Sequence, residues 1–296
     1  MSTSISRRKL LAAAAASGLL APLAKAAEKA VAAPIRQGRL KQSVMATVWG
    51  QNSPFNFVQR CEILSMLGFS GMDLPQADQI PVLADHGLVP ALMVTGGTSF
   101  QQGLIRKEIH DKIVDATHES IDLAVKVGCP TLITMPGERH GMSREEGADH
   151  AIEVLKRIAP YAEQKGINVC MEITNSKVAA DNRTDQVFDD INWGFKVCRA
   201  VNSPRIKVLY DIYHVQIMNG DVVRTLHDNL DLCAHIHVAG VPTRAEIDDS
   251  QELNFHFIAK QIADMGYQGY VSHEWRPTPG RNALLSLASC FDILVV

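Results

Sequence analysis

Short apolar runs alternate with longer amphipathic segments along most of the chain. Runs this short, rich in β-branched residues and bounded by turn residues, are typical of strands that are buried on both faces. The strands expected from them span residues 42–49, 72–74, 88–94, 130–135, 167–172, 206–211, 234–238 and 269–274. The helices expected between and after them span about 54–67, 78–86, 106–127, 143–165, 184–201, 221–229, 255–265 and 282–294.

Local signals indicate where several of these helices begin and end. Ser53 before Pro54 combines a favourable N-cap residue with proline at the first helical position. Ser143 followed by Glu146 matches a capping box for the helix expected over 143–165. Gly87 ends the helix expected over 78–86.

Eight expected strands alternate with eight expected helices over residues 41–296. This alternation predicts an α/β protein with the fold of a (β/α)8 TIM barrel, built as a single domain. A doubly wound open sheet is the alternative, but no G-x-G-x-x-G motif follows the first strand.

The first forty residues differ from the rest in composition. Arg7 and Arg8 precede an apolar, alanine-rich run that is too short to span a membrane, and Ala24-Lys-Ala26 follows it. We therefore expect a twin-arginine signal peptide at residues 1–26, a flexible tether at 27–40 and the barrel at 41–296. The twin-arginine export machinery would carry the folded protein, with its cofactor, to the periplasm. An ordinary basic N-terminus is the alternative interpretation.

Composition and charge exclude some classes of partner. The 296 residues carry a formal net charge of −3, so there is no electrostatic basis for binding nucleic acid or an anionic membrane. The six cysteines are scattered without a C-x-x-C pair. We expect buried thiols rather than a disulfide framework or a zinc site.

Four successive strands each carry a metal-binding or acid–base side chain near the C-terminal end. These residues are Glu172, Asp211, His237 and Glu274. In a parallel barrel they would converge at the C-terminal face, where three unpaired carboxylates would repel one another unless a cation lay between them. The mostly oxygen donor set suits Mn²⁺, Mg²⁺ or Co²⁺. The alternative for any one of them is a salt-bridged or solvated residue at a strand end.

Other polar residues lie near these strand ends. His214 is expected in the loop above the metal, where it would bond to a substrate oxygen, unless it caps a helix or faces solvent. Arg244 is expected in the loop after the seventh strand, where it would hold a substrate carboxylate or carbonyl, unless it is simply exposed. His235 is expected one layer below the site, His273 on the opposite face of its strand, and Glu252 either beside the site or at a helix start.

Five segments carry a resemblance to a known family. They are Met171-Glu-Ile-Thr-Asn175, Tyr210-Asp-Ile-Tyr-His214 with Gln216-Ile-Met-Asn-Gly-Asp221, Ala234-His-Ile-His-Val-Ala-Gly-Val-Pro-Thr-Arg244, Glu252-Leu-Asn254-Phe, and Met265-Gly-Tyr-Gln-Gly-Tyr270 through Glu274. They resemble the hydroxypyruvate isomerase branch of the xylose isomerase-like barrels, most densely from residue 172 to 277. The resemblance implies a divalent metal held by the four strand-end residues above, Glu172 and Glu274 as acid and base, and His214 and Arg244 as substrate ligands. His237 stands where the closest hydroxypyruvate isomerases have glutamine, and agrees instead with the ketose epimerases.

These observations predict an isomerase or epimerase of a small hydroxy-carbonyl substrate, a hydroxypyruvate-like keto-acid or a ketose, that reacts through a cis-enediolate. A metal-dependent lyase or dehydratase would need the same intermediate, and a periplasmic sugar-binding protein would need no catalytic glutamates. A phosphodiesterase of the apurinic-endonuclease type would need further metal ligands and a basic groove. Barrels of this family often pair, which leaves a homo-oligomer open.

Overall fold

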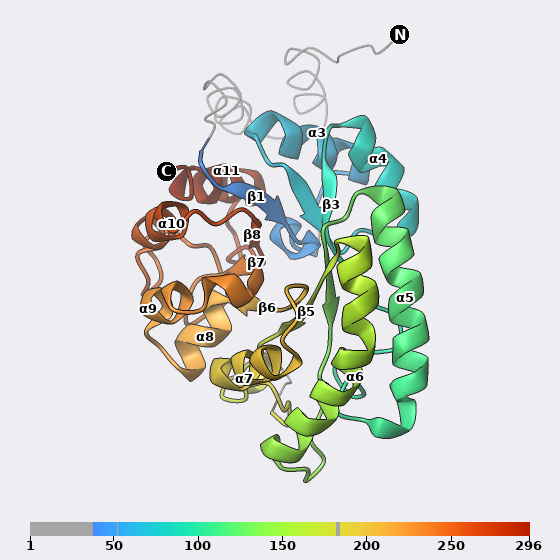
Figure 1. Cartoon of the computed structure of the whole chain (residues 1–296). Coiled ribbons are helices and arrows are strands. Elements are labelled where there is room, and N and C mark those ends of the chain that lie inside the picture. The colour runs from blue at the N-terminus through green and yellow to red at the C-terminus, as the bar shows by residue number, and fades with distance from the viewer. Residues whose placement is uncertain (1–37, 52, 182–183) are drawn as a thin grey trace, which may run out of the picture.

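Eight parallel strands close into one barrel in sequence order, β1 to β8 (Figure 1). A computed structural model describes residues 38–51, 53–181 and 184–296 of the chain. The expected signal peptide and most of the expected tether lie outside the described residues. The predicted (β/α)8 barrel is confirmed, and the alternative of an open sheet is wrong because β1 pairs with β8 as well as with β2.

The strands are short, as the apolar runs predicted. They are β1 (Lys41–Val44), β2 (Gly71–Asp73), β3 (Val89–Val94), β4 (Thr131–Thr134), β5 (Asn168–Glu172), β6 (Ile206–Asp211), β7 (Cys233–Val238) and β8 (Tyr270–His273). All neighbours pair in parallel, so every strand has its C-terminal end at the same rim of the barrel. This rim is where side chains from distant parts of the sequence meet.

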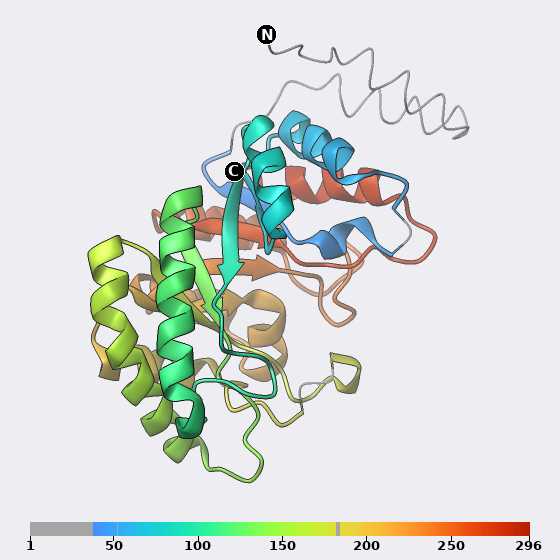
Figure 2. The same ribbon diagram turned by 90° about the vertical axis from the view of Figure 1, so that its right-hand side faces the viewer.

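Helices surround the barrel on its outside (Figures 1 and 2). The α-helices are α3 (Phe57–Leu67), α4 (Ile80–Asp85), α5 (His110–Val127), α6 (Arg144–Lys165), α7 (Ile191–Val201), α8 (Ile212–Met218), α9 (Val222–His227), α10 (Phe255–Asp264) and α11 (Ala283–Ile293). Short 3₁₀ helices are η1 (Ala46–Trp49), η2 (Ala77–Gln79), η3 (Lys107–Ile109), η4 (Ala179–Asp181) and η5 (Leu230–Leu232). No helix among the described residues is long and apolar enough to cross a membrane.

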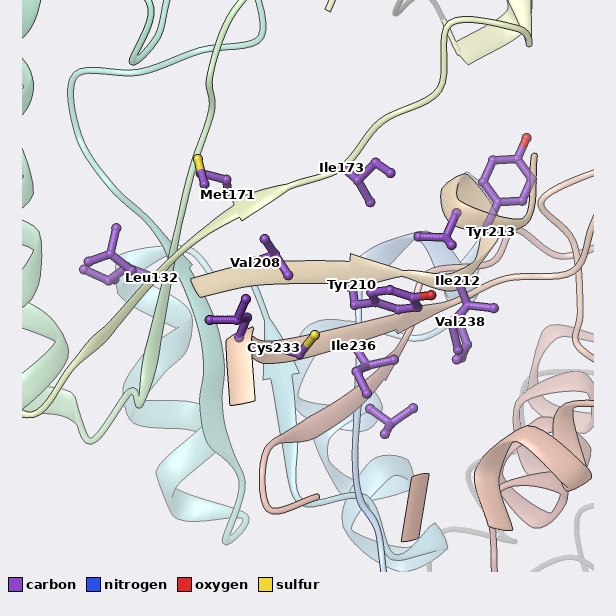
Figure 3. Packing of buried hydrophobic residues seen from close by; sticks show 14 of the residues in the cluster. Leu132, Met171, Ile173, Val208, Tyr210, Ile212, Tyr213, Cys233, Ile236 and Val238 are labelled. Atoms are coloured by element: carbon purple, nitrogen blue, oxygen red, sulfur yellow. The ribbon is translucent and has the colours of Figure 1, made fainter. Parts of the chain in front are cut away.

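Alternate residues of each strand face the helices and the barrel interior. Val208 and Tyr210 on β6, and Ile236 on β7, belong to the large cluster between strands and helices (Figure 3). The residues between them, such as Leu209, face inward. This period of two places alternate side chains of a strand against the helices and inside the barrel.

The barrel interior is apolar on one side and polar on the other. The apolar side comes from β3 to β7 and consists of Leu92, Ile133, Cys170, Leu209 and Ala234. The polar side comes from β1, β2, β7 and β8 and holds Ser43, Asp73, His235 and Ser272, all buried. The polar side lies directly below the candidate site.

Several element boundaries differ from the predictions. The strand expected over 42–49 ends at Val44, and η1 follows it. Helix α3 begins three residues later than predicted, because Asn56 rather than Ser53 is its N-cap and forms a reciprocal capping box with Gln59. In contrast, Ser143 caps α6 as predicted and accepts a hydrogen bond from the backbone N–H of Glu146.

Helix α7 also begins later than predicted, at Ile191 instead of residue 184. The backbone groups of the residues before Ile191 are hydrogen-bonded to other segments of the chain. Gln186 forms an antiparallel bridge with Glu138, and the carbonyl of Phe188 accepts a hydrogen bond from the N–H of Thr174. The segment is therefore fixed against the β4 and β5 loops rather than wound into the helix.

The cysteines agree with the prediction of buried thiols. All six are free and buried, namely Cys61, Cys129, Cys170, Cys198, Cys233 and Cys290.

Candidate active site

Four side chains from the rim of the barrel meet above its interior. Glu172 ends β5, Asp211 ends β6, His237 lies near the end of β7, and Glu274 directly follows β8. One potential ligand atom from each lies within 4.8 Å of the others. His237 Nδ1 is 3.3 Å from a Glu172 oxygen and 3.0 Å from a Glu274 oxygen. The structure thus brings together the four residues that the sequence singled out.

The electrostatics of this cluster are strongly coupled. Burial and the charge of Glu274 raise the pKa of Asp211 to about 8. Burial would also raise the pKa of Glu274, but Arg244 and His237 hold it well below its usual range. Burial lowers the pKa of His237, but Glu274 and hydrogen bonds to carboxylates raise it well above its usual value. Without a further cation, the cluster therefore retains protons near neutral pH.

The donor set fits a divalent cation. Among the described residues, no donor forms a hydrogen bond with Oδ2 of Asp211, although this atom is buried. His214 Nε2 and Arg244 Nη2 lie 3.3 and 3.7 Å from this oxygen, and a cation held by Glu172, Asp211, His237 and Glu274 would be a closer charged partner for it. Three carboxylates and one imidazole agree with Mn²⁺, Mg²⁺ or Co²⁺, which prefer oxygen-rich sites.

His214 lies on a helix and not in the loop where it was expected. Helix α8 begins directly after Asp211, whose Oδ1 accepts a hydrogen bond from the N–H of Tyr213 and so caps the helix. His214 is buried, and its Nε2 is 3.3 Å from Oδ2 of Asp211. Its Nδ1 is 2.7 Å from Nδ2 of Asn175, which donates to it. The interpretations of His214 as a capping or solvent-facing residue are therefore wrong.

Arg244 covers the cluster from the loop between β7 and α10. Its Nη2 is 2.7 Å from Oε1 of Glu274 and 3.7 Å from Oδ2 of Asp211. The guanidinium also lies over the ring of Tyr213, at 5.1 Å from the ring centre. Only 12% of the Arg244 side chain is exposed, so the interpretation as a solvated loop arginine is wrong.

The loop after β5 adds residues that the sequence reasoning missed. Asp181 accepts hydrogen bonds from Nδ2 of Asn175 at 2.8 Å and from the hydroxyl of Tyr213 at 3.1 Å. A second Asp181 oxygen lies 3.6 Å from Nη1 of Arg244. The loop is thereby joined to both α8 and Arg244. In the sequence, the feature that pointed to this loop as part of the site was Asn175, which lies three residues after Glu172.

A family model described as a xylose isomerase-like TIM barrel matches residues 68–290. The chain belongs to this family. The closed barrel and the cluster at its C-terminal rim agree with the match.

Two relatives of this xylose isomerase-like barrel carry isomerase names. The 2-oxo-tetronate isomerase of Pectobacterium atrosepticum is 25% identical over 236 residues, which are 75% of this chain and 87% of that protein. A Xenopus laevis protein with the provisional name hydroxypyruvate isomerase is 28% identical over 172 residues, 56% of this chain and 62% of that protein. The expected relationship to hydroxypyruvate isomerases and similar enzymes is confirmed.

Solved structures share the fold. A family 2 AP endonuclease from Brucella melitensis superimposes with a TM-score of 0.72 at 24% identity, covering 86% of this chain and 98% of that one. At this identity the likeness establishes the barrel and says nothing about the reaction.

The other residues considered in the sequence analysis lie below the site, in the helix layer or at the protein surface. His235 lies below the site, as expected, with its Nε2 2.7 Å from Oδ2 of Asp73. His273 faces the helix layer, where its ring contacts Phe69. Glu252 is exposed and neither reaches the cluster nor caps α10, whose N-cap is Asn254. Asp73, at the end of β2, was not singled out from the sequence.

Proposed function

We propose that this protein is an isomerase or epimerase of a small hydroxy-carbonyl compound, a hydroxypyruvate-like keto-acid or a ketose, and that it works with a divalent cation. The observation that carries the proposal is the pair of glutamates that face the same nitrogen of His237, Glu172 at 3.3 Å and Glu274 at 3.0 Å. Two carboxylates beside one cation site are what proton transfer next to a carbonyl requires. The isomerase names of the relatives support this reaction class.

The four clustered residues would hold the cation, through the oxygens of Glu172, Asp211 and Glu274 and through Nδ1 of His237. When bound, the cation polarises the substrate carbonyl and stabilises negative charge on two neighbouring oxygens. The residues below the cluster, Ser43, Asp73, His235 and Ser272, are all buried, so the site lies in a low-dielectric interior that strengthens these interactions.

Glu274 and Glu172 would move the proton. One carboxylate takes the proton from the carbon beside the carbonyl. The electrons of the broken C–H bond form a carbon–carbon double bond, and the carbonyl π electrons move to the carbonyl oxygen, which gives a cis-enediolate once the adjacent hydroxyl also gives up its proton. A proton returned to the former carbonyl carbon gives the isomer, in which the hydroxyl oxygen has become the carbonyl and the former carbonyl oxygen takes up the hydroxyl proton. A proton returned to the opposite face of the original carbon restores the carbonyl and gives the epimer. Because Arg244 and His237 keep the pKa of Glu274 low, Glu274 is held as a carboxylate, the form that accepts a proton.

His214 and Arg244 would hold the substrate oxygens. Both lie beside Asp211 at the mouth of the cluster, with His214 Nε2 at 3.3 Å and Arg244 Nη2 at 3.7 Å from the same oxygen. A guanidinium presents several donors in a plane and matches a carboxylate or a vicinal carbonyl and hydroxyl. A protein that only bound sugars would have no need for the two glutamates.

Proton exchange in D₂O, followed by NMR, tests the proposal. The protein is incubated with Mn²⁺ or Mg²⁺ and with hydroxypyruvate, 2-oxo-tetronate, ketopentoses and ketohexoses in turn. We expect deuterium to replace hydrogen on the carbon beside the carbonyl of at least one compound. This exchange should stop when a chelator is added and in the Glu274→Gln variant. Glu252→Gln, which changes an exposed glutamate outside the cluster, is the matched control and should keep the wild-type rate. Tight binding of a compound without any exchange would support a sugar-binding protein instead.

We also propose that the protein is exported to the periplasm by the twin-arginine route. The support is the sequence alone, namely Arg7-Arg8 before an apolar run and Ala24-Lys-Ala26. Replacement of both arginines by lysine keeps the charge and should leave the protein in the cytoplasmic fraction. Equal amounts of wild type and variant in the periplasmic fraction would contradict this proposal and leave the enzymatic one untouched.

A further inference from the structure

A buried carboxylate lies directly beneath the four clustered residues. Asp73, the last residue of β2, receives hydrogen bonds from three neighbours. The hydroxyl of Ser43 donates to Oδ1 at 2.9 Å, and Nε2 of His235 and Nε2 of His237 donate to Oδ2 at 2.7 and 3.0 Å. Ser43, Asp73, His235 and His237 are each at most 1% exposed.

The contact with Asp73 determines which nitrogen of His237 faces the cluster. An ionised carboxylate can only accept hydrogen bonds, so Nε2 of His237 must carry the hydrogen. Nδ1 points the other way, 3.0 Å from Glu274 and 3.3 Å from Glu172. In the neutral imidazole, a hydrogen on Nε2 leaves the lone pair of Nδ1 free to bind a cation.

The surroundings hold Asp73 in place. Its two oxygens take part in three hydrogen bonds, with Ser43, His235 and His237. Asp73 is buried, and Leu92, Cys170 and Leu209 form the apolar side of the barrel interior. In such a dry environment, a hydrogen bond to a charged acceptor holds an imidazole firmly.

We propose that Asp73 is a positioning residue that fixes the ring orientation and the protonation of His237 and thereby sets the cation affinity of the site. It acts through His237 and touches neither cation nor substrate. His235 donates to the same oxygen and fixes Asp73 in turn. This inference rests on the cation site of the proposed function. In metal sites generally, a carboxylate behind a ligating histidine contributes about 10- to 100-fold in metal affinity.

The test compares Asp73→Asn with Ser43→Ala. Both remove part of the same buried network, but only the first changes the partner of His237. We expect Asp73→Asn to raise the dissociation constant for Co²⁺ or Mn²⁺ about 10- to 100-fold, measured by competition with a chelator, and to change the visible spectrum of bound Co²⁺. Ser43→Ala should stay within about twofold of wild type in affinity and should leave the spectrum unchanged. Thermal unfolding of the metal-free proteins reports any purely structural loss.

A measurement on the unaltered protein covers the case in which Asp73→Asn does not fold. In Zn²⁺-loaded protein with ¹⁵N-labelled histidine, NMR should show a hydrogen on Nε2 of His237 and none on Nδ1. The reverse assignment, or equal affinities of Asp73→Asn and Ser43→Ala, overturns the inference. If wild type binds two metal ions and Asp73→Asn binds one, Asp73 is itself a metal ligand, and the inference that it is a positioning residue is overturned as well. If wild type binds no cation, the proposed function falls with it, whereas tight wild-type binding with an unaffected Asp73→Asn removes this inference alone.

Discussion

Arg244 is the residue that lets three carboxylates lie close together at the rim of the barrel. It is 2.7 Å from Glu274 and 3.7 Å from Asp211, and its guanidinium rests on the ring of Tyr213. Its charge lowers the pKa of Glu274, whereas Asp211, which lies farther from the guanidinium, has a raised pKa. The arginine lowers the pKa of both carboxylates, but at Asp211 burial and the charge of Glu274 outweigh it.

Replacement of this arginine should change both binding and pH dependence. Arg244→Met removes charge-assisted hydrogen bonds of about 1.5–3 kcal/mol, so we expect KM to rise about 10- to 100-fold. Loss of the positive charge also raises the pKa of Glu274, which moves the acidic limb of the kcat/KM profile to higher pH. Steady-state kinetics across pH measure both effects. Lys177→Met, on the exposed side of the loop after β5, is the control, and an unmoved acidic limb would show that Arg244 does not influence Glu274.

Asp211 joins a strand to a helix in one residue. It ends β6, caps α8 with Oδ1 and leaves Oδ2 for the cluster. The sequence analysis ended the strand at residue 211 and expected His214 in a loop, so it did not predict α8. Periodicity cannot identify a helix in so short and mostly apolar a segment.

The strands were predictable from the sequence, whereas the starts of α3 and α7 were not. A parallel strand inside a barrel is apolar on both faces, so each appears as a distinct run. Helix starts depend on one side chain, and Ser53 and Asn56 are both acceptable caps. The structure uses Asn56 because Gln59 returns a hydrogen bond to its backbone. The polar segment before α7 carried no pattern, since its partners come from the β4 loop.

Stability measurements can verify the true start of α3. Asn56→Ala removes the acceptor of the Gln59 N–H and should lower the free energy of unfolding by about 1 kcal/mol. Ser53→Ala should lower the free energy of unfolding by only a few tenths of a kcal/mol, since Ser53 lies outside the helix. Urea denaturation of the two variants gives both values, and cation affinity should not change in either. The opposite order of stabilities would return the start of α3 to Ser53.

At the scale of the whole molecule, the barrel explains which site residues could be found from sequence. Strand ends of a parallel barrel share one rim, so the residues at the ends of β5 to β8 could be grouped before the structure was known. Asp73 could not, because β2 has only three residues and its partner His235 lies 162 positions away. Asp181 lies in a loop without regular pattern, and only its contacts with Tyr213 and Arg244 place it at the site.

The clustered ionisable side chains at the rim also make the stability of the whole barrel depend on pH. Burial and Glu274 raise the pKa of Asp211 from 3.8 to about 8, and the pKa of His237 lies well above 6.5. Between pH 6.5 and 8 the folded, metal-free protein therefore keeps protons that the unfolded chain has already released. Its free energy of unfolding must fall as the pH rises through this range. Buried His273, whose pKa burial lowers to about 3, opposes this fall up to about pH 7.5, because the unfolded chain still holds part of its histidine protons there.

A divalent cation should cancel this dependence, because it takes the place of the protons. We expect Tm in chelator to fall from pH 6.5 to 8, and Tm with Mn²⁺ to stay level or rise. At a Mn²⁺ concentration of 100 times Kd, binding adds about 2.7 kcal/mol, or about 5 °C in Tm for a domain of this size. Calorimetry at the two pH values measures both effects, and Asp211→Asn should show a weaker fall in chelator. A metal-free Tm that rises over this range would mean that the rim carboxylates are already compensated within the chain, and that the cluster has no need of a cation.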